Sequence, residues 1–159
     1  DMMEVGNGMT EAEDRAHFSM WCMLAAPLMA GNDLSAMSPQ TIEILTNREA
    51  IAVDQDSLGI QGLKYLAEDS LEVWFKPLTG GEWAACFLNR SRLPKKVLFD
   101  WKSHKIEDSF SGRAIDFSTS QWRIRDLWAH REIGTTRKPF SAEIPSHDVR
   151  MLRLQPARK

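Results

Sequence analysis

The sequence predicts an α/β part over residues 1–62, followed by an all-β antiparallel sandwich over residues 63–159. Two observations predict this order. The first third combines helical periodicity and helix caps with one short apolar run, whereas the remainder alternates apolar and polar residues between closely spaced turn signals. The length of 159 residues allows a hydrophobic core, and 43% hydrophobic with 26% charged residues is typical of a globular protein.

The first predicted helix begins after Thr10 and ends before Pro27. Thr10 and Glu13 have the spacing of a capping box, and three acidic residues fall in the first turn, where the helix dipole favours them. Apolar residues recur at helical spacing and form a wide face, so we expect this helix to be well buried. Pro27 cannot continue a helix and marks its end.

The stretch PLMAGND, residues 27–33, predicts a short buried strand that leads into a polar loop. A second helix is predicted over SPQTIEILTN, with Ser38 as its cap, Pro39 in its first position and Asn47 at its end. Asn47 also has the position to cap a helical turn in REAIAV, before the loop DQDSLGIQG. Such elements cannot bury their apolar faces alone, so they resemble the last units of a larger α/β structure.

From Leu63 onward the sequence predicts about eight strands that close into an antiparallel sandwich. In LEVWFKP, Leu71, Val73 and Phe75 alternate with more polar neighbours, and TGGE at residues 79–82 predicts a hairpin turn. The predicted strands are residues 70–78, 83–89, 95–101, 106–110, 114–118, 122–129, 139–145 and 149–155.

Tryptophans and cysteines are expected in the interior. The neighbours of the tryptophans alternate as in strands, which favours a place in the sheet core over a sugar-binding face. Cys22 and Cys86 lie in the apolar runs MWCML and WAACFLN, so we expect buried free thiols. The six tryptophans occupy positions 21, 74, 83, 101, 122 and 128.

Charge and motif content exclude several classes of partner and site. A net charge of -2 gives no broad basic surface, so we expect no nucleic-acid partner and no membrane partner. The longest apolar stretch, residues 18–30, contains a proline and is too short to span a bilayer. The four histidines lack metal-ligand spacing and no phosphate-binding glycine loop occurs, so we expect no metal and no cofactor.

Several long motifs carry a resemblance to a known family. DMMEVGNGMTEAEDRAHFSMWCMLAAPLMAGNDL and ILTNREAIAVDQDSLGIQG, followed by LEVWFKPLTGGEWAACFLNRS and FSAEIPSHDVRMLRL, closely resemble glycoside hydrolase family 27 of clan D, the α-galactosidases and α-N-acetylgalactosaminidases, or melibiases. The resemblance covers nearly the whole chain. It implies that residues 1–62 are the last units of a (β/α)8 TIM barrel, from the end of strand seven to helix eight, and that a C-terminal β domain follows.

The same resemblance assigns candidate site residues. Asp1 and Met2 match the end of the family signature Asp-Pro-Asp-Met-Leu, which implies a polar pocket residue and an apolar wall of a sugar site. The alternatives from the residues alone are a solvated carboxylate at Asp1 and ordinary packing at Met2. Asn32 and Asp33 are expected to be structural residues near the catalytic face. Asp56 with its neighbour Gln55 is expected to lock a loop between barrel and β domain.

The resemblance also implies that no catalytic residue lies in this chain. A retaining glycosidase uses two carboxyl groups, and in the family these follow strands four and six. We therefore expect the remaining barrel in a preceding portion, in the same or a separate chain. The other acids are expected to be solvated or to cap turns and helices, including Asp14, Asp54, Asp100 and Asp148.

The function implied is hydrolysis of terminal α-linked galactose by double displacement, with an α-galactoside as substrate and the segment alone inactive. Two alternatives stay open: an α-N-acetylgalactosaminidase of the same family, and a non-catalytic β-sandwich fragment that binds sugar or packs against a domain. The style of the β domain suggests a secreted or periplasmic parent.

Overall fold

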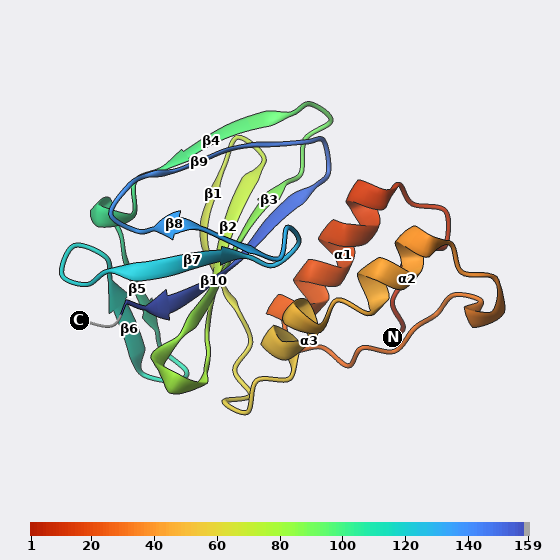
Figure 1. Cartoon of the computed structure of the whole chain (residues 1–159), viewed down its shortest axis with the longest axis horizontal. Helices are drawn as coiled ribbons and strands as arrows, with labels where there is room; N and C mark the ends of the chain where they lie inside the picture. Colours follow the sequence, from red (N-terminus) through yellow and green to blue (C-terminus); the bar gives the residue numbers. More distant parts are fainter. Residues whose placement is uncertain (158–159) are drawn as a thin grey trace.

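Three helices cover one face of a central antiparallel sheet, and two smaller sheets cover its other face (Figure 1). The computed structural model describes residues 1–157. The helices are α1 (Glu11–Met23), α2 (Pro39–Leu45) and α3 (Arg48–Asp54), with 3-10 turns η1 (Leu34–Ala36), η2 (Thr79–Gly81) and η3 (Trp101–Ser103).

The predicted helix caps are confirmed. Thr10 and Glu13 form both bonds of a capping box, and α1 ends at Met23, ahead of Pro27. Ser38 caps α2 with Pro39 at its start. Asn47 caps α3, where its side chain accepts hydrogen bonds from the backbone N–H groups of the first turn. These caps depend on residues within one helical turn, which is why the sequence reveals them.

The described residues contain ten strands, all paired antiparallel, which confirms the all-β class of the second part. The central sheet has the order β1-β2-β3-β10-β7-β8, and β4-β9 and β5-β6 form the smaller sheets. The strands are β1 (Leu63–Glu68), β2 (Leu71–Pro77), β3 (Trp83–Asn89), β4 (Lys95–Phe99), β5 (Lys105–Asp108), β6 (Arg113–Asp116), β7 (Trp122–Asp126), β8 (Arg131–Thr135), β9 (Phe140–Ile144) and β10 (Val149–Pro156).

Two of these strands were not predicted from the sequence. In β1 the register shifts between Lys64 and Leu66, so the alternation of apolar and polar residues is interrupted. In β8 the first four residues are exposed, because the strand lies at the edge of the sheet and contains Gly134. Neither segment therefore shows the two-residue period that identifies a half-buried strand.

Both faces of the central sheet are buried. On one face lies the sandwich core, which includes Phe75, Phe87, Phe99, Trp101, Phe117 and Phe140. On the other face lies the helix-facing core, which includes Phe18, Cys22, Met23, Ala84, Cys86 and Met151. Successive residues of β3 alternate between these two cores, which explains why WAACFLN is apolar at nearly every position.

The helices and the central sheet are therefore packed together through the helix-facing core. The division of the chain into 1–62 and 63–159 stays a prediction, and its boundary falls where β1 begins. Within the described residues, no helix has the length and apolarity to cross a membrane.

The predicted strand over residues 27–33 is wrong. The segment makes only an isolated parallel bridge, between Met3 and Ala30, and no strand is formed there. Two short segments without further parallel neighbours provide too few hydrogen bonds for a regular ladder.

The interior positions of the aromatic and thiol side chains agree with expectation. Trp83, Trp101 and Trp122 are buried in the sandwich core. The other three tryptophans are half-buried and pack against the helix-facing core, so no tryptophan forms an open aromatic face. Cys22 and Cys86 are both buried and free.

Candidate functional site

The segments around Met3 and Ala30 lie side by side and run parallel. The N–H of Met3 donates to Met29 O at 2.7 Å, and the N–H of Gly31 donates to Met3 O at 3.0 Å. A Cβ at Gly31 would lie only 2.7 Å from Met3 O, so this close approach requires glycine. The pairing is that of neighbouring strands in a parallel sheet, and it brings the two following loops together.

The predicted sugar-pocket residues are exposed. Asp1 and Met2 are open to solvent, and the exposed fraction of Met2 is 55%. The Cβ of Met2 lies 3.1 Å from the position that a Cβ on Gly31 would occupy. Met2 therefore lies against the segment that leads into Asn32, although it makes no part of the buried core.

The loop after Ala30 is organised by Asp33. Its Oδ1 accepts hydrogen bonds from the backbone N–H of Ser35 at 2.9 Å and from Ser35 Oγ at 2.6 Å. These bonds lower the pKa of Asp33, because they stabilise the carboxylate. Asn32 differs, since its Oδ1 is buried and has no hydrogen-bond partner among the described residues.

A hollow of about 530 Å³ separates the two loops. Asn32 and Asp33 both line it, together with residues 6–9, Glu11 and Asp14 at the start of α1, and residues 36–38, 40 and 41. Asp1 and Met2 do not line it. The structure thus brings together one predicted pair in this hollow and places the other pair on the adjoining exposed surface.

Asp14 has a role that sequence reasoning missed. Both of its carboxylate oxygens accept a hydrogen bond from the N–H of Gly6 at 3.1 Å, which ties the loop after Met3 to α1. Asp14 is buried, and burial raises its pKa while the bond from Gly6 opposes that change. The expected solvated or capping role is therefore wrong for Asp14. The sequence did not indicate this role, because three acidic residues lie in the first turn of α1 and each of them fits a capping pattern.

The expected solvated or capping role is also wrong for Asp148, which is buried and paired with Arg15. The Asp148 carboxylate accepts hydrogen bonds from Arg15 Nε at 2.9 Å and from Arg15 Nη2 at 2.7 Å. Arg15 lies on α1 and Asp148 precedes β10, 133 positions further along the chain.

The two remaining acids differ in exposure. Asp54 is half-buried, and burial raises its pKa. Asp100 is exposed and accepts a hydrogen bond from Ser103 Oγ at 3.0 Å.

Asp56 links the loop after α3 to the turn η2 between β2 and β3. Its Oδ1 accepts from the N–H of Thr79 at 2.9 Å, and its Oδ2 accepts from Thr79 Oγ1 at 2.7 Å. These bonds agree with the expected loop lock. Gln55 is exposed, and its backbone N–H donates to Ile51 O at the end of α3. Its side chain makes no hydrogen bond with the residues that the structure describes.

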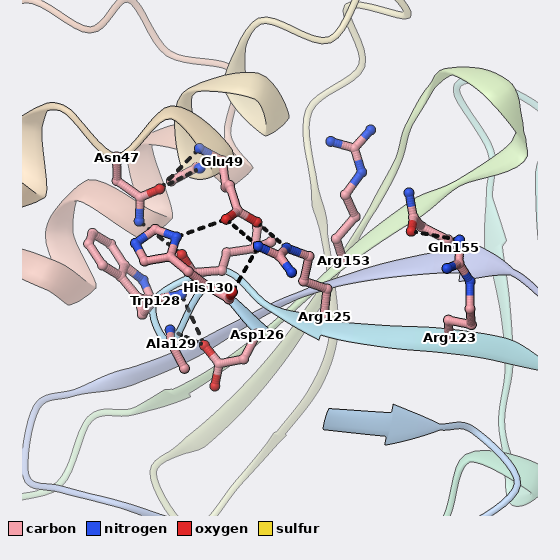
Figure 2. A network of polar contacts seen from close by, with 12 residues as sticks. Asn47, Glu49, Arg123, Arg125, Asp126, Trp128, Ala129, His130, Arg153 and Gln155 are labelled. Carbon is pink, nitrogen blue, oxygen red and sulfur yellow. Dashed lines mark hydrogen bonds and ion pairs between the residues drawn. The ribbon is translucent and has the colours of Figure 1, made fainter. Parts of the chain in front are cut away.

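A polar network joins the start of α3 to β7 and the turn that follows (Figure 2). Glu49 accepts two hydrogen bonds from Arg125, at 2.6 and 2.9 Å, and lies 2.8 Å from His130 Nδ1. Asn47 caps α3 and also donates to Leu127 O at 3.0 Å. The bonds from Arg125 lower the pKa of Glu49, with burial opposing them. The network fixes α3 on the sheet and presents no open pair of carboxyl groups.

No group of three His, Cys, Asp or Glu side chains in residues 1–157 is placed to hold a metal ion. The chemistry that the described site offers is therefore hydrogen bonding and apolar contact at two neighbouring loops.

Comparison with known proteins gives consistent matches along the chain. The family model of the alpha galactosidase C-terminal beta sandwich domain matches residues 68–154, and the model described as Alpha galactosidase A matches residues 1–56. Alpha-galactosidase A of Cellvibrio japonicus is 48% identical over 156 residues, which cover 98% of this chain and 38% of that protein.

Solved structures agree with these matches. Alpha-galactosidase I of Mortierella vinacea superposes with a TM-score of 0.86 at 29% identity, over 99% of this chain and 39% of that one. The α-galactosidase of Saccharomyces cerevisiae solved with raffinose gives a TM-score of 0.81 at 22% identity, over 99% of this chain and 46% of that one. The chain thus spans less than half the length of these relatives.

Proposed function

This chain belongs to the alpha-galactosidase family of glycoside hydrolases, and on that premise we propose that it forms the C-terminal part of an enzyme that hydrolyses terminal α-linked galactose. The reaction is a double displacement with retention. Its two carboxyl groups, a nucleophile and an acid/base, come from the preceding barrel portion. This chain supplies substrate contacts at the barrel rim and the β domain that supports them.

The observation that carries the proposal is the parallel pairing of Met3 with Ala30. In barrels of this kind, active-site groups lie where parallel strands end and loops begin. Asp1 and Met2 directly precede Met3 in one of the two paired segments, and Asn32 with Asp33 follows Ala30 in the other. An α-galactoside is the substrate class named for the relatives, including the yeast enzyme solved with raffinose.

Each residue has a distinct role in the proposed site. The Asp1 carboxylate accepts hydrogen bonds from sugar hydroxyl groups, and the exposed Met2 side chain packs against the apolar face of the ring. Asn32 and Asp33 shape the neighbouring loop, where Asp33 already uses its Oδ1 for Ser35. Neither pair performs a proton transfer or a nucleophilic attack.

The test is the hydrolysis of p-nitrophenyl α-galactoside by the full-length enzyme and by its Asp1→Ala variant. Loss of a charged hydrogen-bond acceptor is expected to lower kcat/KM by about 10- to 100-fold. Asp100→Ala is the matched control, because the carboxylate of that exposed acid beside η3 accepts a hydrogen bond from Ser103 Oγ and from no other side chain in residues 1–157. This variant is expected to leave kcat/KM unchanged. Residues 1–159 alone are expected to show no turnover.

Three results would contradict parts of this proposal. Equal kcat/KM for Asp1→Ala and the wild type would remove Asp1 from the site. Turnover by residues 1–159 alone would place the catalytic carboxyl groups in this chain. A full-length enzyme that cleaves only p-nitrophenyl α-N-acetylgalactosaminide would replace galactose by N-acetylgalactosamine as the substrate.

A further inference from the structure

Lys76 is a buried lysine in the middle of the molecule. It lies near the end of β2, its exposed fraction is 1%, and its side chain faces the helices. Nζ donates to Cys22 O at 3.0 Å and to Val53 O at 2.7 Å. Cys22 belongs to the last turn of α1 and Val53 to the last turn of α3, so one ammonium group joins the ends of two helices.

The location suits a cation. The last four carbonyl groups of a helix lack partners within the helix, and they carry the partial negative charge of the helix dipole. Burial lowers the pKa of Lys76, and the carboxylate of Asp54 opposes this change. The next carbonyl of α1, Met23 O, accepts from the N–H of Gly62 at 2.7 Å, so the end of α1 is satisfied by groups outside the helix.

Helix α1 connects this contact to the candidate site at both of its ends. At its start, Asp14 holds the N–H of Gly6 in the loop that follows Met3. After its end, the chain turns at Ala25, which has a positive φ of 51°, and then pairs with Met3. Because α1 is joined to the two paired segments at both of its ends, a shift of α1 along the sheet also moves these segments relative to the sheet.

We propose that Lys76 is a positioning residue for substrate binding, through which the β domain holds α1 and thereby the segments that carry Asp1 and Met2. The inference rests on the proposed function. It assigns the β domain a part in substrate affinity, although no residue of that domain touches the sugar. Removal of the ammonium group leaves Val53 O without a donor and leaves Cys22 O with only the weaker bond from the N–H of Ala25, at 3.3 Å, so the contact that holds the ends of α1 and α3 together is lost and α1 shifts.

The experiment is the measurement of KM and kcat for p-nitrophenyl α-galactoside with the full-length enzyme and its Lys76→Met variant. KM does not depend on how much of the enzyme is folded, whereas partial unfolding lowers only the apparent kcat. We expect KM to rise by about 2- to 10-fold, the size of one hydrogen bond. Lys96→Met, at an exposed position of β4, is the matched control and should keep the wild-type KM.

Lys76→Gln provides the second variant, because its amide NH2 still donates hydrogen bonds but is uncharged and reaches less far, so it should give an intermediate KM. If Lys76→Met does not fold, the KM of Lys76→Gln decides alone. An unchanged KM in a folded variant, with or without a lower kcat, would overturn the proposal, and so would failure of both variants to fold, since Lys76 would then serve stability only. A wild-type enzyme without activity on any α-galactoside would instead refute the proposed function.

Discussion

The sandwich core and the helix-facing core lie on opposite faces of one sheet but are built differently. The sandwich core is dense in aromatic rings, with Trp101 in contact with Phe87, Phe99 and Phe117 at centroid distances of 4.9 to 6.1 Å. The buried part of the helix-facing core is mostly aliphatic and sulfur-containing, with Phe18 among it. Polar contacts that are buried or partly buried surround this core, and Figure 2 shows those around Glu49. The polar contacts around this core include Arg15 with Asp148, Glu49 with Arg125, and Lys76 with two helix ends.

This difference means that one core stabilises the sandwich, while the contacts around the other fix the position of the helices on the sheet. Apolar burial is non-directional, so the aromatic core stabilises the sandwich without fixing what lies outside it. Hydrogen bonds and ion pairs depend on distance and angle, so the contacts around the helix-facing core select one position of the helices on the sheet. A helix that carries the proposed substrate-binding segment needs the second property.

The largest effect is expected in the sandwich core, from Trp101→Ala. Truncation of a fully buried tryptophan is expected to lower the free energy of unfolding by about 3–5 kcal/mol, through lost apolar burial and the cavity left behind. Phe110→Ala is the control, because Phe110 is 78% exposed and its loss should change little. Urea unfolding of the full-length enzyme measures the free energy of unfolding of both variants. Equal effects of the two variants would show that the aromatic cluster does not carry the stability of the sandwich.

A smaller effect is expected at the rim of the helix-facing core, from Arg15→Met. Asp148 then keeps a buried carboxylate without its charged donor, which is expected to lower the free energy of unfolding by about 2 kcal/mol. Glu11→Gln breaks only the exposed partner of Arg15 and should cost less than about 0.5 kcal/mol. If the two variants are equally destabilised, the bond to Asp148 does not hold α1 on the sheet.

The smallest change in the free energy of unfolding is expected from Arg125→Met, and the size of this change should depend on pH. Arg125 lowers the pKa of Glu49 below its ordinary value of 4.5, so the folded protein binds fewer protons there than the unfolded chain. The stabilisation from Glu49 is therefore present above pH 4.5 and is lost as the pH falls through the lowered pKa. The difference in unfolding free energy between wild type and Arg125→Met should shrink from pH 7 to pH 3. A difference that stays constant would contradict this coupling.

Local features of both regions could be predicted from the sequence. The caps at Thr10, Ser38 and Asn47 and the TGGE turn depend on residues a few positions apart. The two strands without clean alternation, β1 and β8, could not be predicted in this way.

Long-range polar contacts were beyond sequence reasoning. In β2 the alternation of Val73 and Phe75 with Glu72 and Lys76 is typical of a strand with one solvent face, yet both charged residues are buried. The helices cover that second face, and nothing in the local pattern shows this. The family resemblance indicated Asp1 and Met2, but the tie between Asp14 and Gly6 became visible only when the loop and α1 were placed together.

The central claim, that the sugar is bound beside the paired segments of Met3 and Ala30 and that both cores only support these segments, is tested most directly by NMR of the full-length enzyme labelled with ¹³C in its methionine methyl groups. Galactose is added, and the Met2 signal is assigned with Met2→Leu. The account predicts that the Met2 signal shifts, whereas those of Met23 and Met151 in the helix-facing core do not. Saturating galactose that leaves Met2 unchanged, or that shifts Met23 and Met151 instead, would contradict it.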